Sequence, residues 1–131
     1  GSNAGVGSRG RGAFPNVGLK LSAITNFIQV CGGERKIRHL TTRQIVDKYI
    51  IPVTRPPQSS YATLLQKRDK SLVRKADVFV IHAWGGRFLD TYYALKYHYK
   101  NTPDVFLWMD VFCLPQWDAP RGLESRGGLE S

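Results

Sequence analysis

Cysteine is scarce in this sequence of 131 residues: Cys31 and Cys113 are the only two, and neither has a CxxC partner. This scarcity argues against a disulfide framework and a cysteine zinc site, and it predicts a reduced, intracellular and cytoplasmic chain. No apolar run approaches the ~18 residues that a membrane span requires. No apolar signal core is present near the first residues, so we expect neither a membrane-spanning chain nor a secreted one.

Several catalytic and cofactor motifs are also missing. The sequence has no GxGxxG or GxxxxGK[ST] phosphate loop and no GxSxG nucleophile elbow. His39, His82 and His98 lack metal-ligand spacing with cysteines or carboxylates, so we predict no metal site. Cys113 and His82 would form a thiol–imidazole pair only if the fold joined them, and a buried structural cysteine is the favoured interpretation. No motif therefore predicts a bound cofactor.

Acidic residues are rare in the first part of the chain. Residues 1–75 hold 14 of the 19 lysines and arginines but only 3 of the 10 acidic residues. Such an excess of positive charge suits nucleic acid, anionic lipid or an acidic protein surface, although a solvated face is the plainer interpretation. A nucleic-acid binder stays an alternative, but it lacks interleaved aromatics that would stack on bases. The candidates for a basic patch are Arg35, Lys36, Arg38, Lys67, Arg68, Lys70, Arg74 and Lys75.

The two ends of the chain differ in composition from its middle. Residues 1–13 are mostly glycine, serine, alanine and arginine, which is typical of a flexible tail, and they begin like an expression-vector remnant. Residues 121–131 contain a repeat, RGLES followed by RGGLES, and are predicted to be a tail as well. Between them we predict a helical, basic lead-in over residues 14–76 and a strand–helix–strand unit over residues 77–120.

Helical periodicity organises the lead-in. Apolar residues at helical spacing over 21–31 predict a first helix, which the glycine pair at 32–33 ends. A second helix is predicted to be capped by Thr41 or Thr42, with Gln44 completing a capping box if Thr41 is the cap, and to end at Pro52. A third, short helix is predicted to follow the serine pair at 59–60.

The second part of the chain has a strand–helix–strand pattern. Residues 77–82 and 105–112 are continuous apolar runs rich in β-branched and aromatic residues, which is typical of buried strands. Between them, apolar residues recur at helical spacing from Phe88 to Tyr99. This order predicts two parallel strands joined by a right-handed crossover. We expect the lead-in helices to cover one face of these strands and the crossover helix to cover the other.

Candidate site residues follow both predicted strands. His82, Ala83 and Trp84 come at the end of the first, and Asp110 and Gln116 come at the end of the second. Ligands of open α/β sheets bind outside the carboxyl ends of the strands, so these five candidates are expected at one rim. A histidine at such a place is more often a packed or capping group than a catalyst. A carboxylate within an apolar run needs a partner.

Two of these runs resemble a known family. The run DVFVIHAWG at 77–85 resembles the first strand of TIR-like domains, in a branch found in protists and fungi. The run FLWMDVFCLPQ at 106–116 resembles the second strand of that branch, and also a run in fungal heterokaryon-incompatibility domains. Residues 40–54 and Ser60–Tyr61 are similar to its helical lead-in. The resemblance covers about residues 19–118.

The resemblance implies an α/β fold, in which a helical lead-in packs on part of a flavodoxin-like parallel sheet. It also implies a signalling or interaction module that assembles with its own kind, so that a second copy or another TIR-like domain is the expected partner. Catalytic relatives cleave NAD. An NAD-cleaving hydrolase is therefore the alternative function, with NAD as its candidate ligand.

The sequence also departs from the family pattern. Ile81 stands where the family usually has serine, and Leu114–Pro115 replaces a pair that contains asparagine. Catalytic relatives carry a glutamate on a later helix, and no position here can take that role because Glu124 and Glu130 lie in the repeat-like tail. The sequence therefore predicts an incomplete domain with an open strand edge, and we expect that edge to cause self-association.

Overall fold

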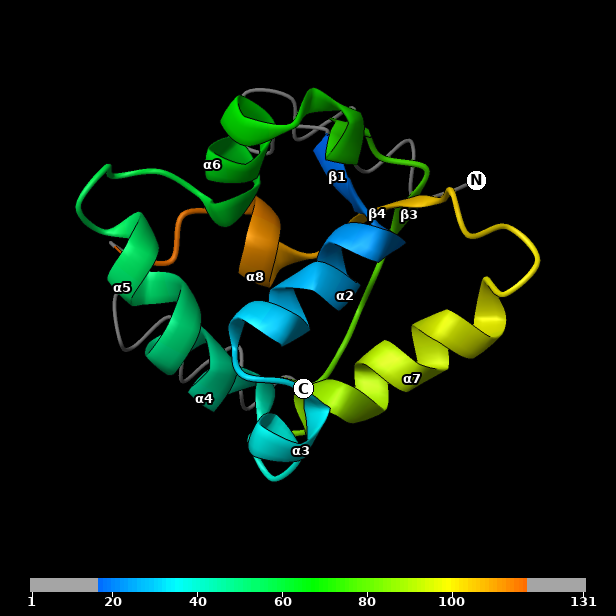
Figure 1. The fold of residues 1–131 in the computed structure, drawn as a ribbon, viewed down its shortest axis with the longest axis horizontal. Coiled ribbons are helices and arrows are strands. Elements are labelled where there is room, and N and C mark those ends of the chain that lie inside the picture. The colour runs from blue at the N-terminus through cyan, green and yellow to red at the C-terminus, as the bar shows by residue number, and fades with distance from the viewer. Residues whose placement is uncertain (1–16, 118–131) are drawn as a thin grey trace.

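A four-stranded sheet lies at the centre of residues 17–117, the part of the chain that the computed structural model describes (Figure 1). Its strands are β1 (Val17–Lys20), β2 (Val73–Lys75), β3 (Val78–Phe79) and β4 (Phe106–Trp108), in the order β2-β1-β4-β3. β1 is antiparallel to β2 and β4, whereas β3 and β4 are parallel as predicted. The α/β class is confirmed, with a mixed sheet in place of a wholly parallel one. The predicted tails at 1–13 and 121–131 lie outside the described residues.

Two of the strands belong to the segment that the sequence predicts to be helical. β1 has four residues and β2 has three, too few to show the alternation that marks a strand in a sequence. β1 lies between β2 and β4. The predicted parallel pair therefore gains two antiparallel neighbours from the lead-in, and the sheet has four strands where two are predicted.

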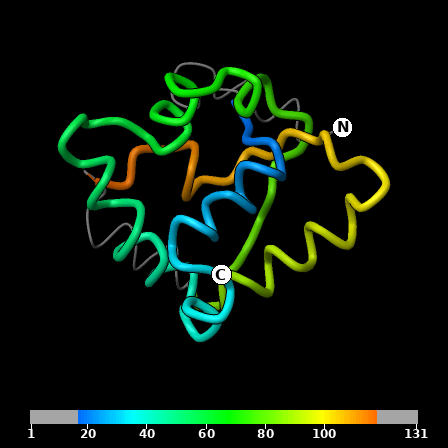
Figure 2. Tube along the Cα trace, in the orientation of Figure 1, coloured from blue at the N-terminus to red at the C-terminus, as the bar shows by residue number. Residues whose placement is uncertain are grey.

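Helices connect and cover the strands, and Figure 2 follows their path along the chain. The central helix α2 follows β1 directly, and α7 forms the crossover between the parallel strands β3 and β4. The helical elements are α2 (Leu21–Val30), α3 (Glu34–Ile37), α4 (Thr42–Ile45), the π-helix η1 (Val46–Ile50), α5 (Ile51–Thr54), α6 (Tyr61–Arg68), the 3-10 helix η2 (Lys70–Leu72), α7 (Phe88–His98) and α8 (Asp110–Cys113).

The structure has most of the helix ends that the sequence predicts. α2 stops before Gly32 and Gly33, whose φ angles of +107° and +98° lie in the left-handed region that glycine adopts without strain. The amide of Gln44 donates to the hydroxyl of Thr41 at 3.2 Å, and the Gln44 side chain accepts from the Thr41 amide at 2.9 Å. This is the capping box expected at the start of α4. The hydroxyl of Ser60 caps α6 by accepting from the Thr63 amide at 3.1 Å, without the reciprocal bond.

Pro52 does not end the second helix, contrary to the sequence prediction. The helix widens into the π turn η1 just before Pro52 and continues through α5. A proline ring clashes with the carbonyl four residues earlier in a regular α-helix, and a wider turn moves that carbonyl away. The hydroxyl of Thr54 then donates to the carbonyl of Ile50 at 2.8 Å, across the proline.

Most of the buried side chains gather on one face of the sheet. Leu19 on β1 is paired with Val73 on β2 and with Leu107 on β4, and all three side chains are buried. Aromatic rings join the same core: the ring centroids of Phe27 and Phe112 are 5.1 Å apart in an edge-to-face contact. Burying a ring of this size stabilises the fold by about 1.5–3 kcal/mol. The central helix α2 and the short helix α8 are thus held by one core.

The crossover helix α7 packs beside α2, whereas the sequence predicts it on the opposite face of the strands. The hydroxyls of Tyr92 on α7 and Thr25 on α2 are hydrogen-bonded at 2.7 Å. The ring of Phe88 lies 5.9 Å from that of Phe27. The buried residues of α7 join the core that α2 covers, because β1 and β2 extend the sheet and let both helices share it.

The strand predicted over 77–82 is shorter and less buried than its apolar sequence suggests. β3 spans only Val78–Phe79, and both residues are half-buried. It lies at the edge of the sheet because β1 takes the other side of β4. Ile81, just beyond it, is 92% exposed. An apolar run alone does not distinguish a central strand from an edge strand, since both are rich in the same residues.

Gly18 allows β1 and β4 to lie close together. A Cβ atom at this position would lie 2.9 Å from the backbone nitrogen of Leu107 and 3.0 Å from the Cβ of Ala76. Gly85 is the matched control, since a Cβ there has nothing within 4 Å. We expect Gly18→Ala to lower the free energy of unfolding by about 1–3 kcal/mol. Gly85→Ala is expected to change it by less than about 0.5 kcal/mol. Urea unfolding followed by tryptophan fluorescence measures both, and equal values would contradict this packing.

Candidate functional site

The parallel strands β3 and β4 end at the same edge of the sheet, and the predicted site residues follow them there. His82 comes shortly after β3, and Asp110 begins α8 after β4. The Nε2 atom of His82 lies 2.8 Å from Oδ1 of Asp110. The indole nitrogen of Trp84 donates to Oδ2 of the same carboxylate at 3.2 Å. The structure thus brings together three of the five predicted rim residues around one carboxylate.

Gln116 supports this carboxylate from the backbone side. Its buried side-chain amide donates to the carbonyl of Asp110 at 2.8 Å and to that of Leu114 at 3.1 Å. These two bonds fix the chain that follows β4 against the start of α8. Ala83, the fifth predicted residue, is exposed and contributes its carbonyl, which accepts from the amide of Gly86 at 3.1 Å.

The loop after His82 is attached to the start of α4, which the sequence analysis did not foresee. The amide of Thr42 donates to the carbonyl of Gly86 at 2.9 Å, and the amide of Arg43 donates to that of Trp84 at 3.1 Å. These are first-turn amides, which have no partner within their own helix. The capping box at Thr41 was the only signal in the sequence, because it marked where such free amides would be. The basic lead-in therefore positions Trp84.

His82 is held so that neither ring nitrogen reaches solvent freely. Its side chain is only 3% exposed, whereas that of Asp110 is 33% exposed. An ionised carboxylate only accepts hydrogen bonds, so Nε2 of His82 carries the hydrogen that Asp110 accepts. The other nitrogen, Nδ1, is buried and has no hydrogen-bond partner. A general base needs a nitrogen within reach of a substrate proton, so this geometry favours a positioning role for His82.

These hydrogen bonds hold the carboxylate of Asp110 in one orientation at the rim of the sheet. His82 and Trp84 each occupy one oxygen of Asp110, and the rings of these two residues lie 5.8 Å apart. The side chain of Asp110 is far more exposed than that of His82, so an incoming ligand would meet the carboxylate rather than the imidazole. A carboxylate with this arrangement binds a hydrogen-bond donor or a cation.

Neither cysteine is poised as a nucleophile. Burial raises the pKa of the Cys113 thiol to about 12 and that of the Cys31 thiol to about 11. Both side chains are buried and both are free thiols. The active form of a cysteine is the thiolate, which these pKa values suppress at neutral pH. The structural interpretation of Cys113 is therefore favoured over a pair with His82.

The predicted basic residues are all exposed, but they do not form one stripe. Arg35, Lys36 and Arg38 belong to α3 and its end, at the bottom of Figure 1. The others belong to the segment from α6 to β2, at the top of the same view: Lys67, Arg68, Lys70, Arg74 and Lys75. The separation of the two groups weakens the nucleic-acid interpretation, because phosphate binding needs a continuous track of positive charge.

Between residues 17 and 117, no three or more histidine, cysteine or acidic side chains are grouped so that they could hold a metal ion. None of the helices in that range has both the length and the apolar character needed to cross a bilayer.

No protein-family model matches the chain, and no curated protein or solved structure is significantly similar to it. The function is therefore inferred from the chain's own residues and their geometry.

Removing the charge of Asp110 tests the rim cluster. Asparagine keeps only one accepting oxygen and replaces the other with an NH2 donor, so either His82 or Trp84 no longer faces a carboxylate oxygen. We expect Asp110→Asn to lower the free energy of unfolding by about 1–3 kcal/mol. Asp104→Asn is the control, because Asp104 is 83% exposed and makes a surface ion pair with Lys20. Its effect is expected to be below about 1 kcal/mol. Equal losses in denaturant unfolding would contradict the cluster.

The thiol pKa values give a chemical test. A rise in pKa from 9.0 to about 11 leaves about a hundredfold less thiolate at neutral pH, and burial limits access further. We expect both cysteines of the folded chain to react with a disulfide reagent at pH 8 at least a hundredfold more slowly than in the urea-unfolded chain. Rapid reaction of Cys113 in the folded chain, lost in Cys113→Ser, would contradict the structural role.

Proposed function

We propose that this chain is a TIR-like signalling or interaction module that acts by self-association. The two runs that resemble the family, residues 77–85 and 106–116, supply β3, β4 and the four hydrogen-bonded rim residues. Support for self-association comes from one observation: the two edges of the sheet differ in how they are protected.

One edge is protected by charge. β2 forms this edge, and both Arg74 and Lys75 on it are exposed. Charged side chains on an edge strand oppose pairing with another chain, because the added strand would bury or crowd them. The guanidinium of Arg74 also lies 4.3 Å from the centre of the Phe106 ring, which holds it against the sheet.

The other edge has no such protection. β3 pairs only with β4, and the chain from Val78 to His82 contains no lysine, arginine or proline. Ile81, next to the strand, is the most exposed large apolar residue among those described. An unpaired strand edge with an apolar side chain is a template for another strand. A second copy can add its own β3 edge around a two-fold axis, so that each Ile81 meets the partner chain.

Charge placed at this edge tests the proposal. We expect Ile81→Lys to weaken self-association at least tenfold, because it puts like charges at the pairing edge of both copies. Tyr97→Lys on α7 is the matched control: Tyr97 is 73% exposed, so the same charge is added away from β3. Light scattering and sedimentation over micromolar concentrations measure the association of both variants and of the parent chain.

Three outcomes would overturn the proposal. A parent chain that stays monomeric over the whole range has no assembly to explain. Equal weakening by Ile81→Lys and Tyr97→Lys would mean that net charge, not the β3 edge, controls association. NAD consumption by the purified chain that His82→Ala abolishes would favour the NAD-cleaving hydrolase instead.

The hydrolase ranks second because of the geometry of the histidine. The His82–Asp110 pair is the observation that favours an enzyme, since a carboxylate beside a histidine is a common catalytic arrangement. Here the carboxylate occupies Nε2, and Nδ1 is buried. This leaves Asp110 as the accessible group of the pair.

A further inference from the structure

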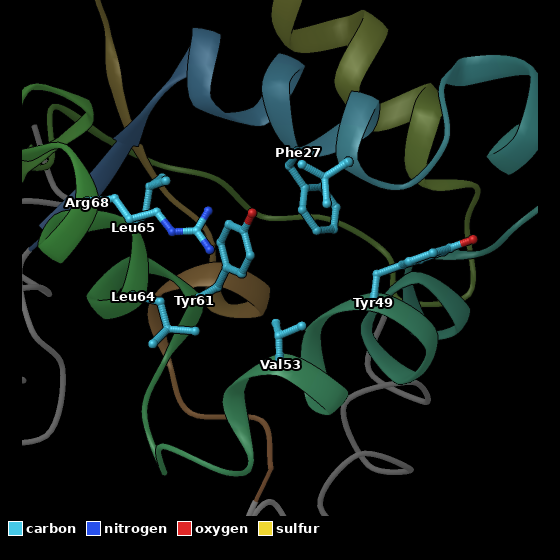
Figure 3. A pocket seen from close by; sticks show the side chains of 8 residues that line it. Phe27, Tyr49, Val53, Tyr61, Leu64, Leu65 and Arg68 are labelled. Atoms are coloured by element: carbon cyan, nitrogen blue, oxygen red, sulfur yellow. The ribbon is translucent and has the colours of Figure 1, made fainter.

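A small apolar hollow lies between α2, the η1–α5 turn and α6 (Figure 3). Its accessible volume is about 100 Å³. Figure 3 shows the side chains around it, with Tyr61 near the centre and Val53 below it. The lining residues come from three separate segments of the chain: Phe27, Val30, Tyr49, Val53, Tyr61, Leu64, Leu65 and Arg68.

The hollow has a rigid floor and an exposed apolar rim. The ring of Phe27 is buried in the core and meets that of Tyr61 edge to face, with centroids 5.2 Å apart. At the rim, Val30 is 73% exposed and Val53 is 48% exposed. These are two of the five large apolar residues that the described part of the chain exposes. Apolar side chains that rim a preformed hollow are typical of an interaction site.

The size of the hollow limits what enters it. Sites for cofactors and drug-sized molecules are about 300–1,000 Å³, several times larger. A volume of about 100 Å³ takes one aliphatic side chain. This is the size of the anchor pockets that receive single hot-spot residues at protein interfaces.

Arg68 supplies a positive charge beside the hollow. It is exposed, and among residues 17–117 no carboxylate forms an ion pair with it. Figure 3 shows its guanidinium extending toward Tyr61. Burial raises the pKa of Tyr61, which stays a neutral hydrogen-bond donor, while the nearby Arg68 acts in the opposite direction. The hollow thus combines apolar walls with a cation at one side.

The surroundings are basic as well. Residues 46–75 contain seven lysines and arginines but only two aspartates. One of these, Asp69, is occupied by the amide and the hydroxyl of Ser71, at 3.0 and 2.6 Å. An approaching acidic surface would be attracted, whereas a basic one would be repelled.

We propose that this hollow docks an acidic amphipathic helix of a partner protein. One apolar side chain of the helix enters the hollow between Val30 and Val53, and a carboxylate beside it binds the guanidinium of Arg68. This is the helix-in-groove mode of recognition, in which apolar anchors give affinity and flanking charges give selectivity. The surface involves α2, α5 and α6, so it is separate from the β3 edge and does not rest on the proposed self-association.

A designed peptide tests the proposal with the full chain. The probe is a labelled helical peptide with leucines at i, i+3, i+4 and i+7 and glutamates beside them. Its partner peptide has glutamines in place of the glutamates. Fluorescence anisotropy is expected to show at least tenfold tighter binding of the glutamate peptide. Arg68→Gln is expected to remove most of that difference, and Val30→Ser to weaken binding of both peptides at least threefold.

Matched variants separate docking from general charge and from unfolding. Lys67→Gln removes the same charge from the same helix at a residue that does not line the hollow. Tyr97→Ser removes an apolar side chain that is as exposed as Val30. Both are expected to bind the glutamate peptide like the parent chain. Thermal melts check that every variant stays folded, which is expected because all four positions are exposed.

Several results would overturn the proposal. A difference of less than twofold between Lys67→Gln and Arg68→Gln would mean that the charge attraction is unspecific. Equal effects of Val30→Ser and Tyr97→Ser would exclude the hollow as the binding site. No binding of either peptide up to millimolar concentration would exclude this class of partner. Phosphatidylserine vesicles provide a last test. Vesicle binding that requires Val30 and Arg68, and with which the peptide does not compete, would mean that the hollow binds a membrane surface. The proposal of a docked helix would then be wrong.

Discussion

The pairing of β4 on both sides is the constraint on which the other parts of the structure depend. Leu107 on this strand is paired with Leu19 of the basic lead-in on one side and with Val78 of the parallel unit on the other. Neither part of the chain has a complete sheet without the other. The same strand leads into Asp110, so the position of the rim carboxylate follows from how the two parts are joined.

Most local structure could be predicted because it depends on short-range chemistry. The glycine pair after α2 and the Thr41 cap act within one helical turn, so their sequence signals were sufficient. β1 and β2 could not be predicted, since strands of three or four residues are stable only through partners far along the chain. Their absence from the prediction also placed α7 on the wrong face of the strands. The prediction that Pro52 ends the second helix failed for a related reason. The π turn before Pro52 relieves the clash of the proline ring with the helix backbone, and the sequence gives no sign of that turn.

The sequence predicts which residues lie together at the rim, but it does not predict how their side chains are arranged. Parallel strands bring His82 and Asp110 to one edge, and that much follows from topology. Which histidine nitrogen meets the carboxylate, and that the other is buried, depend on side-chain packing that no sequence pattern encodes. The attachment of the Trp84 loop to α4 is likewise a tertiary feature. It makes the lead-in part of the site, although none of its side chains is among the rim residues.

The position of β1 also affects how the chain folds as it is synthesised. β1 is the first strand of the described chain to be translated, yet its two neighbours come from residues 73–75 and 106–108. While the ribosome makes the intervening helices, Leu19 has no strand beside it. Pairings between such distant segments form late and slowly, because a long loop must close first. β1 can pair with β2 once residue 75 has been made, but its other neighbour, β4, is made last. The four-stranded sheet is therefore complete only after residues 106–108 have emerged.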